Sequence, residues 1–387
     1  MANKRNNLKM IHGVSLLVGT IVGVGMFGLP YIAAQVGFLP LVIYLCGGAA
    51  IVIAIKLVYG AVIIASDGKK RLPGYVRDYF GKKWSMAALI NFLFGLYGSQ
   101  LVYIIIGGNF LHGLLSPIFP ISQFAATLIF FIVGSFLIYR GLESVAEVEF
   151  FMLIFLILII FLFFIISIGN IRIVNFSGYN LNKIFLPYGI VFFSLMGVSI
   201  LPEIKEIFLK GEKEDNYSKK GKKDFQKTII YSVLISLIIY IIFILTVLGV
   251  SGKNTSPEAF SGLQSILSNK IIYLGYIFGF LTVFTSYLSV GLTIEKSFIY
   301  DYGLKHKNAF VLTCLIPFLL FLTQFNNFLA IIGFLGTITF GIDGCIIFTL
   351  YFKIKKMGKL KESVINNFAA YALVIMFLAG IILSLKF

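Results

Sequence analysis

Apolar runs long enough to cross a lipid bilayer follow one another along almost the whole sequence. A membrane-spanning helix needs about 20 mostly apolar residues. Inside the lipid core every backbone donor must find its partner within the segment, so each span is expected to be a helix. The eleven candidate spans are residues 11–36, 38–66, 84–112, 122–140, 145–168, 186–209, 228–250, 271–299, 310–324, 327–352 and 364–385. The sequence therefore predicts an all-α integral membrane protein.

Composition excludes a water-soluble domain of ordinary surface. Hydrophobic residues make up 59% of the chain and charged residues 12%, whereas soluble domains carry about 45–50% apolar and about 25% charged residues. The loops between the candidate spans are short, and the longest polar one, residues 203–227, has the length of a linker. We therefore expect one transmembrane domain over residues 1–387.

The positive charges fall on one side of the predicted bundle. The net charge is +16, and 26 of the 32 Lys and Arg residues lie in alternate loops, starting with the N-terminal segment. Cytoplasmic loops of membrane proteins carry such an excess. The charge is thus explained by topology rather than by nucleic-acid binding. It predicts a multi-pass protein of the cell membrane, surrounded by lipid, with the N-terminus cytoplasmic and the C-terminus outside.

Two spans contain signals for an interrupted helix. Four glycines and Pro30 occupy residues 19–30, and Gly197 and Pro202 interrupt the span at 186–209. Glycine is a weak helix former and proline removes a backbone donor, although small residues also allow close helix packing. Broken helices at matching positions of two halves are typical of secondary transporters. The first and sixth spans are such a pair.

The same residues carry a resemblance to a known family. Residues 19–30 (GTIVGVGMFGLP) and 33–38 (AAQVGF) resemble the first helix of the amino acid–polyamine–organocation superfamily. Residues 197–203 (GVSILPE) and 285–292 (TSYLSVGL) are similar to its sixth and eighth helices. The nearest branch comprises the aromatic and hydroxy amino acid permeases and the amino acid/auxin permeases. With the eleven-span plan, the resemblance covers nearly the whole chain.

This resemblance implies a LeuT-type fold of two inverted five-helix repeats. The first repeat would be residues 11–168, the inverted second repeat residues 186–352, and an added helix residues 364–385. An amino acid would bind at the two breaks, its carboxylate on backbone amides and its ammonium on carbonyls, with helices 3, 6, 8 and 10 around its side chain. The substrate-binding candidates are Val22, Gly23, Gly25, Met26, Tyr97, Tyr103, Phe193, Ser194, Gly197 and Ser289.

The resemblance also implies a cation site between helices 1 and 8. Its ligands would be Gly19, Val22, Thr282, Thr285 and Ser286, and oxygen ligands suit a hard cation such as sodium. Some sodium-independent relatives place a lysine from helix 5 there, and residues 145–168 contain none. Proton coupling is the alternative, and hydroxyls that bond only within their own helix are another reading. Beyond sodium, no cofactor or metal site is expected.

Lys56, Glu203 and Asp343 lie at comparable depths within candidate spans. Charge inside a membrane is costly and indicates function. We expect Lys56 to pair with Glu203, or else with Asp343, as part of an inner gate or as a static structural pair. With proton coupling, Glu203 or Asp343 would carry the proton.

The sequence thus predicts a secondary active amino acid transporter working by alternating access and cation-coupled symport, for neutral or aromatic amino acids. A proton-coupled permease or an exchanger of the same fold is the alternative. A membrane-embedded transferase is a remote one, because such enzymes cluster acidic groups or histidines at one face. The charged residues here are scattered, so no enzyme is expected. Oligomeric state stays open.

Overall fold

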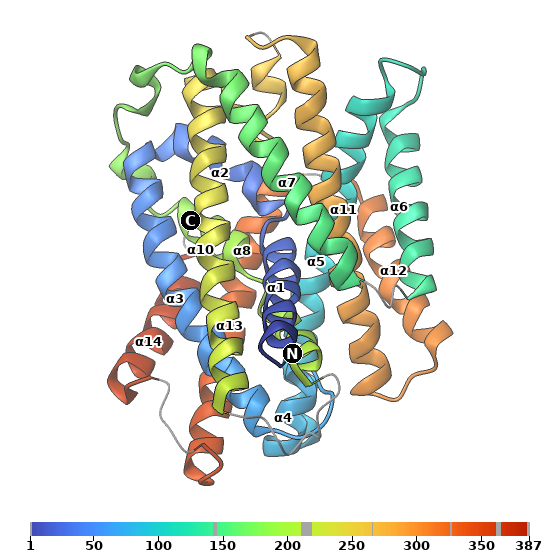
Figure 1. Ribbon diagram of the computed structural model, residues 1–387, viewed down its shortest axis with the longest axis vertical. Coiled ribbons are helices and arrows are strands. Elements are labelled where there is room, and N and C mark those ends of the chain that lie inside the picture. Colours follow the sequence, from blue (N-terminus) through green and yellow to red (C-terminus); the bar gives the residue numbers. More distant parts are fainter. Residues whose placement is uncertain are drawn as a thin grey trace.

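The computed structural model describes residues 2–141, 145–209, 219–264, 266–325, 327–360 and 365–384. This part of the chain is all-helical, as expected (Figure 1). The α-helices are α1 (Ala2–Ile21), α2 (Gly25–Val36), α3 (Phe38–Ala65), α4 (Leu72–Phe80), α5 (Lys82–Leu115), α6 (Gln123–Arg140), α7 (Val145–Ser167), α8 (Pro187–Leu195), α9 (Leu201–Leu209), α10 (Lys219–Ser251), α11 (Asn269–Tyr300), α12 (His306–Leu322), α13 (Phe328–Lys356) and α14 (Asn367–Ser384).

Every candidate span coincides with a helix or a pair of helices. Seven described helices are long and apolar enough to cross a membrane, and α1 with α2 forms an eighth, bent span. α12 and α14 are shorter apolar helices. The short helix α4 was not predicted, because nine residues give too brief a pattern, yet it buries Leu72, Tyr75 and Val76 against its neighbours.

The two predicted helix breaks are present. The first span stops at Ile21 and resumes at Gly25, with a bend of 53° between the halves. The sixth span stops at Leu195, continues through a short 3-10 turn, η4 (Val198–Ile200), and resumes as α9 at Leu201. Gly197 precedes that turn with φ of +96°, a conformation that residues with a Cβ avoid. The glycine therefore permits the backbone to leave the helical conformation there.

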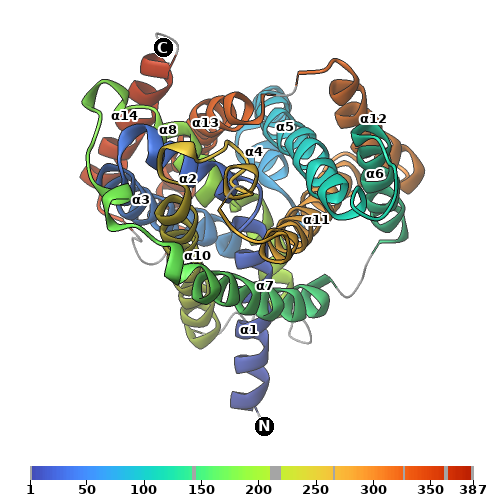
Figure 2. The ribbon, with the colours of Figure 1, turned by 90° about the horizontal axis from the view of Figure 1, so that it is seen from above.

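The broken helices lie inside the bundle. Seen from above, α2 and α8 lie among the other helices and the N-terminal part of α1 projects from the bundle beyond α7, while α6 and α12 form one edge and α14 the opposite edge (Figure 2). Large apolar side chains are exposed on these edge helices, such as Phe136, Leu319 and Ile375. Water-soluble proteins rarely expose apolar area of this extent, so these side chains are suited to contact with lipid tails.

A glycine contact fixes the first half of the sixth span. α8 packs on α13 so closely that a Cβ on Gly336 would overlap the carbonyl oxygen of Gly189. Because the obstacle is backbone, no side chain can move aside. We expect Gly336→Ala to lower the free energy of unfolding by about 1–3 kcal/mol, the usual cost of overpacking. Thermal denaturation of the purified protein would measure the loss.

Gly47→Ala is the matched control for this prediction. Gly47 also lies in a membrane helix, but no atom lies within 4 Å of the place of its missing Cβ. Alanine is the better helix former by about 1 kcal/mol, so this variant should be as stable as the parent or slightly more stable. Equal stability of both variants would contradict the close contact.

Candidate functional site

The two helix breaks touch each other at the centre of the bundle. A Cβ on Gly25 would lie 2.5 Å from the Oγ and 2.8 Å from the Cα of Ser194. A Cβ on Gly23 would lie 2.8 Å from the Oγ of Ser286 on α11. These glycines are required because the backbone of the first break runs directly against α8 and α11. The start of α2, the end of α8 and the middle of α11 therefore meet at the first break.

The first break leaves backbone donors free. The amide of Gly23 donates to the carbonyl of Ile21 at 2.9 Å, but those of Val24 and Gly25 bond to no other group in the described chain. They stand at the N-terminus of α2, where the helix dipole concentrates positive charge. Such a terminus attracts an anionic group like a carboxylate.

The carbonyls at the broken ends are held by two side chains that sequence reasoning did not place there. The hydroxyl of Tyr240, on α10, lies 2.7 Å from the carbonyl oxygen of Ile21 and 2.6 Å from that of Ser194. Having one proton, it donates to one of them at a time. Lys56 donates to the carbonyl oxygens of Leu195 at 3.2 Å and Met196 at 2.9 Å. Both breaks are thereby joined to α3 and α10.

The expected pairing of Lys56 with Glu203 or Asp343 is therefore not formed. Lys56 is fully buried and its ammonium faces the C-terminus of α8, where helix carbonyls concentrate negative charge. Asp343 accepts a hydrogen bond from the side-chain amide of Asn91 at 2.7 Å. Glu203 instead pairs with Arg71, a residue that the sequence places in a basic loop.

Arg71 is the centre of a buried group of charges at the end of the bundle that carries α4. Its guanidinium lies 2.8 Å from Glu203 and 3.5 Å from Glu206, and its backbone amide donates to Asp301 at 3.2 Å. The Glu203 contact is a close ion pair without the alignment of a hydrogen bond. We call these four residues the Arg71 cluster. It connects the loop before α4 with α9 and with the end of α11.

The geometry of the Arg71 cluster determines the pKa of two of its members. Burial lowers the pKa of the Arg71 guanidinium, but the nearby Glu203, Glu206 and Asp301 outweigh burial and raise the pKa above its ordinary value. Arg71 thus stays charged. Burial raises the pKa of the Asp301 carboxyl to about 6, against the opposing effect of its bonds to Arg71 and Ser297. Asp301 therefore changes its charge near neutral pH.

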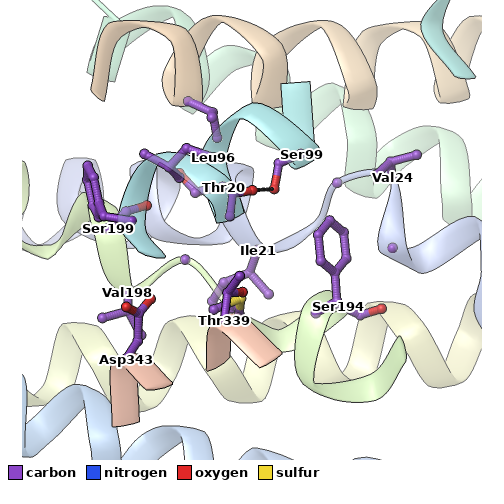
Figure 3. Close-up of a pocket in the computed structure, with 18 of the residues that line it drawn as sticks. Thr20, Ile21, Val24, Leu96, Ser99, Ser194, Val198, Ser199, Thr339 and Asp343 are labelled. Atoms are coloured by element: carbon purple, nitrogen blue, oxygen red, sulfur yellow. Dashed lines mark hydrogen bonds between the residues drawn. The ribbon is translucent and has the colours of Figure 1, made fainter. Parts of the chain in front are cut away.

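A cavity lies between the two breaks (Figure 3). The space within it that is accessible to water-sized groups is about 70 Å³. Its walls come from both broken spans and from α3, α4, α5, α11 and α13. We call it the central cavity. Of the predicted substrate-binding residues, it is lined by Gly23, Gly25, Tyr103, Phe193, Ser194 and Gly197.

The other four predicted residues are not part of its lining. Tyr97 donates to the carbonyl oxygen of Leu312 at 3.0 Å and thus binds α12. Val22, Met26 and Ser289 are buried beside the break. The sequence missed Ser99, Thr339 and the other lining residues of α5 and α13, because single hydroxyls in apolar helices give no signal of the direction they face.

Beyond the central cavity, five phenylalanines fill the bundle on the α2 side of the break. Phe27 lies two residues after Gly25, and its ring centroid is 4.8–6.0 Å from those of its four neighbours. We call this group the phenylalanine plug. Its members are Phe27, Phe110, Phe243, Phe260 and Phe278. These rings pack against one another outside the lining of the central cavity.

The predicted cation ligands of α1 and α11 lie close together. The Oγ of Ser286 is 3.2 Å from the carbonyl oxygen of Gly19 and 3.1 Å from that of Thr282. The Oγ1 of Thr285 is 3.0 Å from the carbonyl oxygen of Thr282. A second, small cavity of about 20 Å³ adjoins Gly19, Thr282 and Thr285. Two hydroxyls and two carbonyls of this kind are the oxygen donors that a hard cation takes.

Comparison with known proteins agrees with this geometry. The sequence model of the tryptophan/tyrosine permease family matches residues 6–385. Tyrosine-specific transport system 1 of Haemophilus influenzae is 24% identical over 301 residues, which are 73% of this chain and 71% of that protein.

Two solved transporters share the arrangement of helices. Mhp1, a nucleobase-cation-symport-1 family transporter in a closed conformation, superposes with a TM-score of 0.70 at 13% identity, over 96% of this chain and 89% of its own. MhsT in complex with L-phenylalanine superposes with a TM-score of 0.66 at 14% identity, over 96% of this chain and 98% of its own. The fold is thus similar to that of LeuT-fold transporters.

Proposed function

The chain belongs to the tryptophan/tyrosine permease family and is a multi-pass membrane transporter rather than an enzyme, and from this premise we propose that it carries aromatic amino acids across the cell membrane by cation-coupled symport. The observation that carries the proposal is the meeting of two helix breaks around the central cavity. Broken helices of this kind supply both the anion-binding and the cation-binding groups of a transporter.

The amino acid is proposed to lie across the two breaks. Its carboxylate would accept hydrogen bonds from the free amides of Val24 and Gly25, at the positive end of α2. Its ammonium would face the carbonyls that end α1 and α8, including that of Phe193. Its side chain would occupy the central cavity. One similar protein is named for tyrosine and another is in complex with L-phenylalanine, and both amino acids have side chains of the size proposed here.

Alternating access would use the two closures on either side of the cavity. We propose that the phenylalanine plug is the outer closure and the Arg71 cluster the inner one. This orientation rests on the excess of Lys and Arg in the N-terminal segment and alternate loops. In this proposal residues 11–168 and 186–352 form inverted repeats and residues 364–385 the eleventh span, as in the amino acid–polyamine–organocation superfamily.

Sodium is the proposed coupling ion, bound by Gly19, Val22, Thr282, Thr285 and Ser286. We expect tyrosine uptake into proteoliposomes to require an inward sodium gradient. Uptake should fall about tenfold or more in the double variant Thr285→Ala/Ser286→Ala, since even outer partners of metal ligands are worth that much. Labelled uptake under sodium, proton or no gradient is the measurement.

Thr293→Ala is the control for this experiment, because that hydroxyl also lies on α11 but bonds only to the carbonyl of Ser289 in its own helix. Uptake driven by protons alone would show that the protein is a proton-coupled permease and not a sodium symporter. Uptake that needs only internal amino acid would indicate an exchanger. No uptake under any condition, with folded protein, would count against the amino acid assignment itself.

A further inference from the structure

One acidic side chain lines the central cavity at the end away from the start of α2. Among the described lining residues, Asp343 on α13 carries the only charge. In Figure 3 it lies with Val198 at one end of the cavity, while Val24 and Ser194 lie at the other end. An amino acid whose carboxylate lies at the Val24 end would therefore reach Asp343 only with the far tip of its side chain.

The Asp343 carboxylate is oriented by one partner and has an oxygen left over. The Asn91 amide on α5 donates to Oδ1 at 2.7 Å, and the same nitrogen is 3.5 Å from the carbonyl oxygen of Thr339. Within the described chain no group donates to Oδ2. An ionised carboxylate only accepts hydrogen bonds, so Oδ2 is available to a donor within the cavity.

Four hydroxyls of the cavity wall are neutral groups whose protons are already engaged, so they are weaker acceptors than a carboxylate. Thr20, Ser99, Ser194 and Thr339 each donate to the carbonyl four residues earlier in their own helix, at 2.6–2.8 Å. Phe92, Leu96 and Val198 supply apolar wall between these groups. The cavity thus combines apolar walls, which suit an aromatic ring, with one acidic acceptor at its end.

We propose that Asp343 selects substrates whose aromatic side chain ends in a hydrogen-bond donor, the phenol hydroxyl of tyrosine or the indole N–H of tryptophan. This inference rests on the proposed function and on the amino acid lying across the breaks. The donor would bond to Oδ2, and Asn91 would act as the positioning residue for the carboxylate. Phenylalanine fills the same space but leaves Oδ2 unpaired, so the site rejects it. Sites built around a substrate hydroxyl discriminate strongly against the analogue that lacks it.

Competition in proteoliposomes tests the proposal. Uptake of labelled tyrosine is measured with unlabelled tyrosine, tryptophan or phenylalanine as competitor, and the ratio of the inhibition constants for phenylalanine and tyrosine is compared between variants. We expect phenylalanine to be roughly tenfold to a hundredfold weaker in the parent, as for hydrogen bonds to a charged group. Asp343→Leu should bring the ratio to about one or invert it, and Asp343→Asn should reduce it.

Two further variants keep the test interpretable. Thr349→Val changes an exposed hydroxyl on the same helix that bonds only to the carbonyl of Cys345, and it should keep the parent ratio. Asn91→Leu leaves Asp343 in place but unpositioned, and it should lower the ratio less than Asp343→Leu. It also serves as the second readout where Asp343→Leu does not fold.

The outcomes separate this inference from the proposed function. Equal losses for tyrosine and phenylalanine in Asp343→Asn would mean that the carboxylate binds a group common to both, such as the ammonium, and would overturn the proposal. Loss of coupling with an unchanged ratio would overturn it in favour of a proton-carrying role. A parent that takes up no amino acid would instead refute the proposed function.

Discussion

Gly25→Ala is expected to abolish amino acid uptake while leaving the protein folded. The added methyl group would lie 2.5 Å from the Oγ and 2.8 Å from the Cα of Ser194, far inside contact distance. Because the Cα belongs to backbone, α2 and α8 must separate. The free amides of the first break would then move relative to the carbonyls of the second. A misplacement of about 1 Å can cost about 100-fold in rate.

The matched control is Gly28→Ala, one turn later on α2. Its added methyl would meet a terminal methyl of Leu329 at 2.6 Å, and a flexible side-chain end can rotate aside. We expect Gly28→Ala to keep most of the uptake. Binding of labelled tyrosine to the purified protein, measured beside uptake, separates lost binding from lost movement. Equal uptake by the Gly25 and Gly28 variants would contradict a substrate site at this contact.

The sequence predicts the breaks well because their cause is local. Glycines and prolines weaken a helix wherever they stand, so residues 19–30 and 194–203 carry the signal themselves. The same holds for the long apolar helices, whose pattern is independent of neighbours. The close approach of Gly25 to Ser194, in contrast, depends on how α2 and α8 pack, and no local pattern encodes it.

The partners of the buried charged side chains could not be predicted from the sequence. Lys56 suggested an ion pair because charge in a membrane needs compensation, but helix-end carbonyls compensate it equally well. Arg71 lies beside Lys69 and Lys70 in a run that counts as a topology signal, and nothing in that run distinguishes the one buried residue. Tyr240 is one of 20 tyrosines. Its role appears only when α1, α8 and α10 are placed together.

Arg71→Met is expected to lower the free energy of unfolding by about 3–5 kcal/mol. Arg71 is fully buried and lies 2.8 Å from Glu203, whose side chain is 9% exposed. Removing one partner of a buried ion pair leaves the other charge without compensation in a medium of low polarity. Glu206 and Asp301 would add repulsion to that cost. Thermal and denaturant unfolding of the purified protein are the measurements.

A second substitution identifies the ion pair as the cause. Glu203→Gln removes the uncompensated charge, so Arg71→Met/Glu203→Gln should regain most of the lost stability, and the coupling energy should exceed about 1 kcal/mol. The neighbour Lys69 is the control: it is 61% exposed and lies 3.8 Å from Glu206, so Lys69→Met should change stability by less than about 1 kcal/mol. A double variant no more stable than Arg71→Met would show that Arg71 stabilises the protein through packing. In that case the Arg71 cluster would lose its electrostatic basis as the inner closure, because a closure held by packing does not need Glu203.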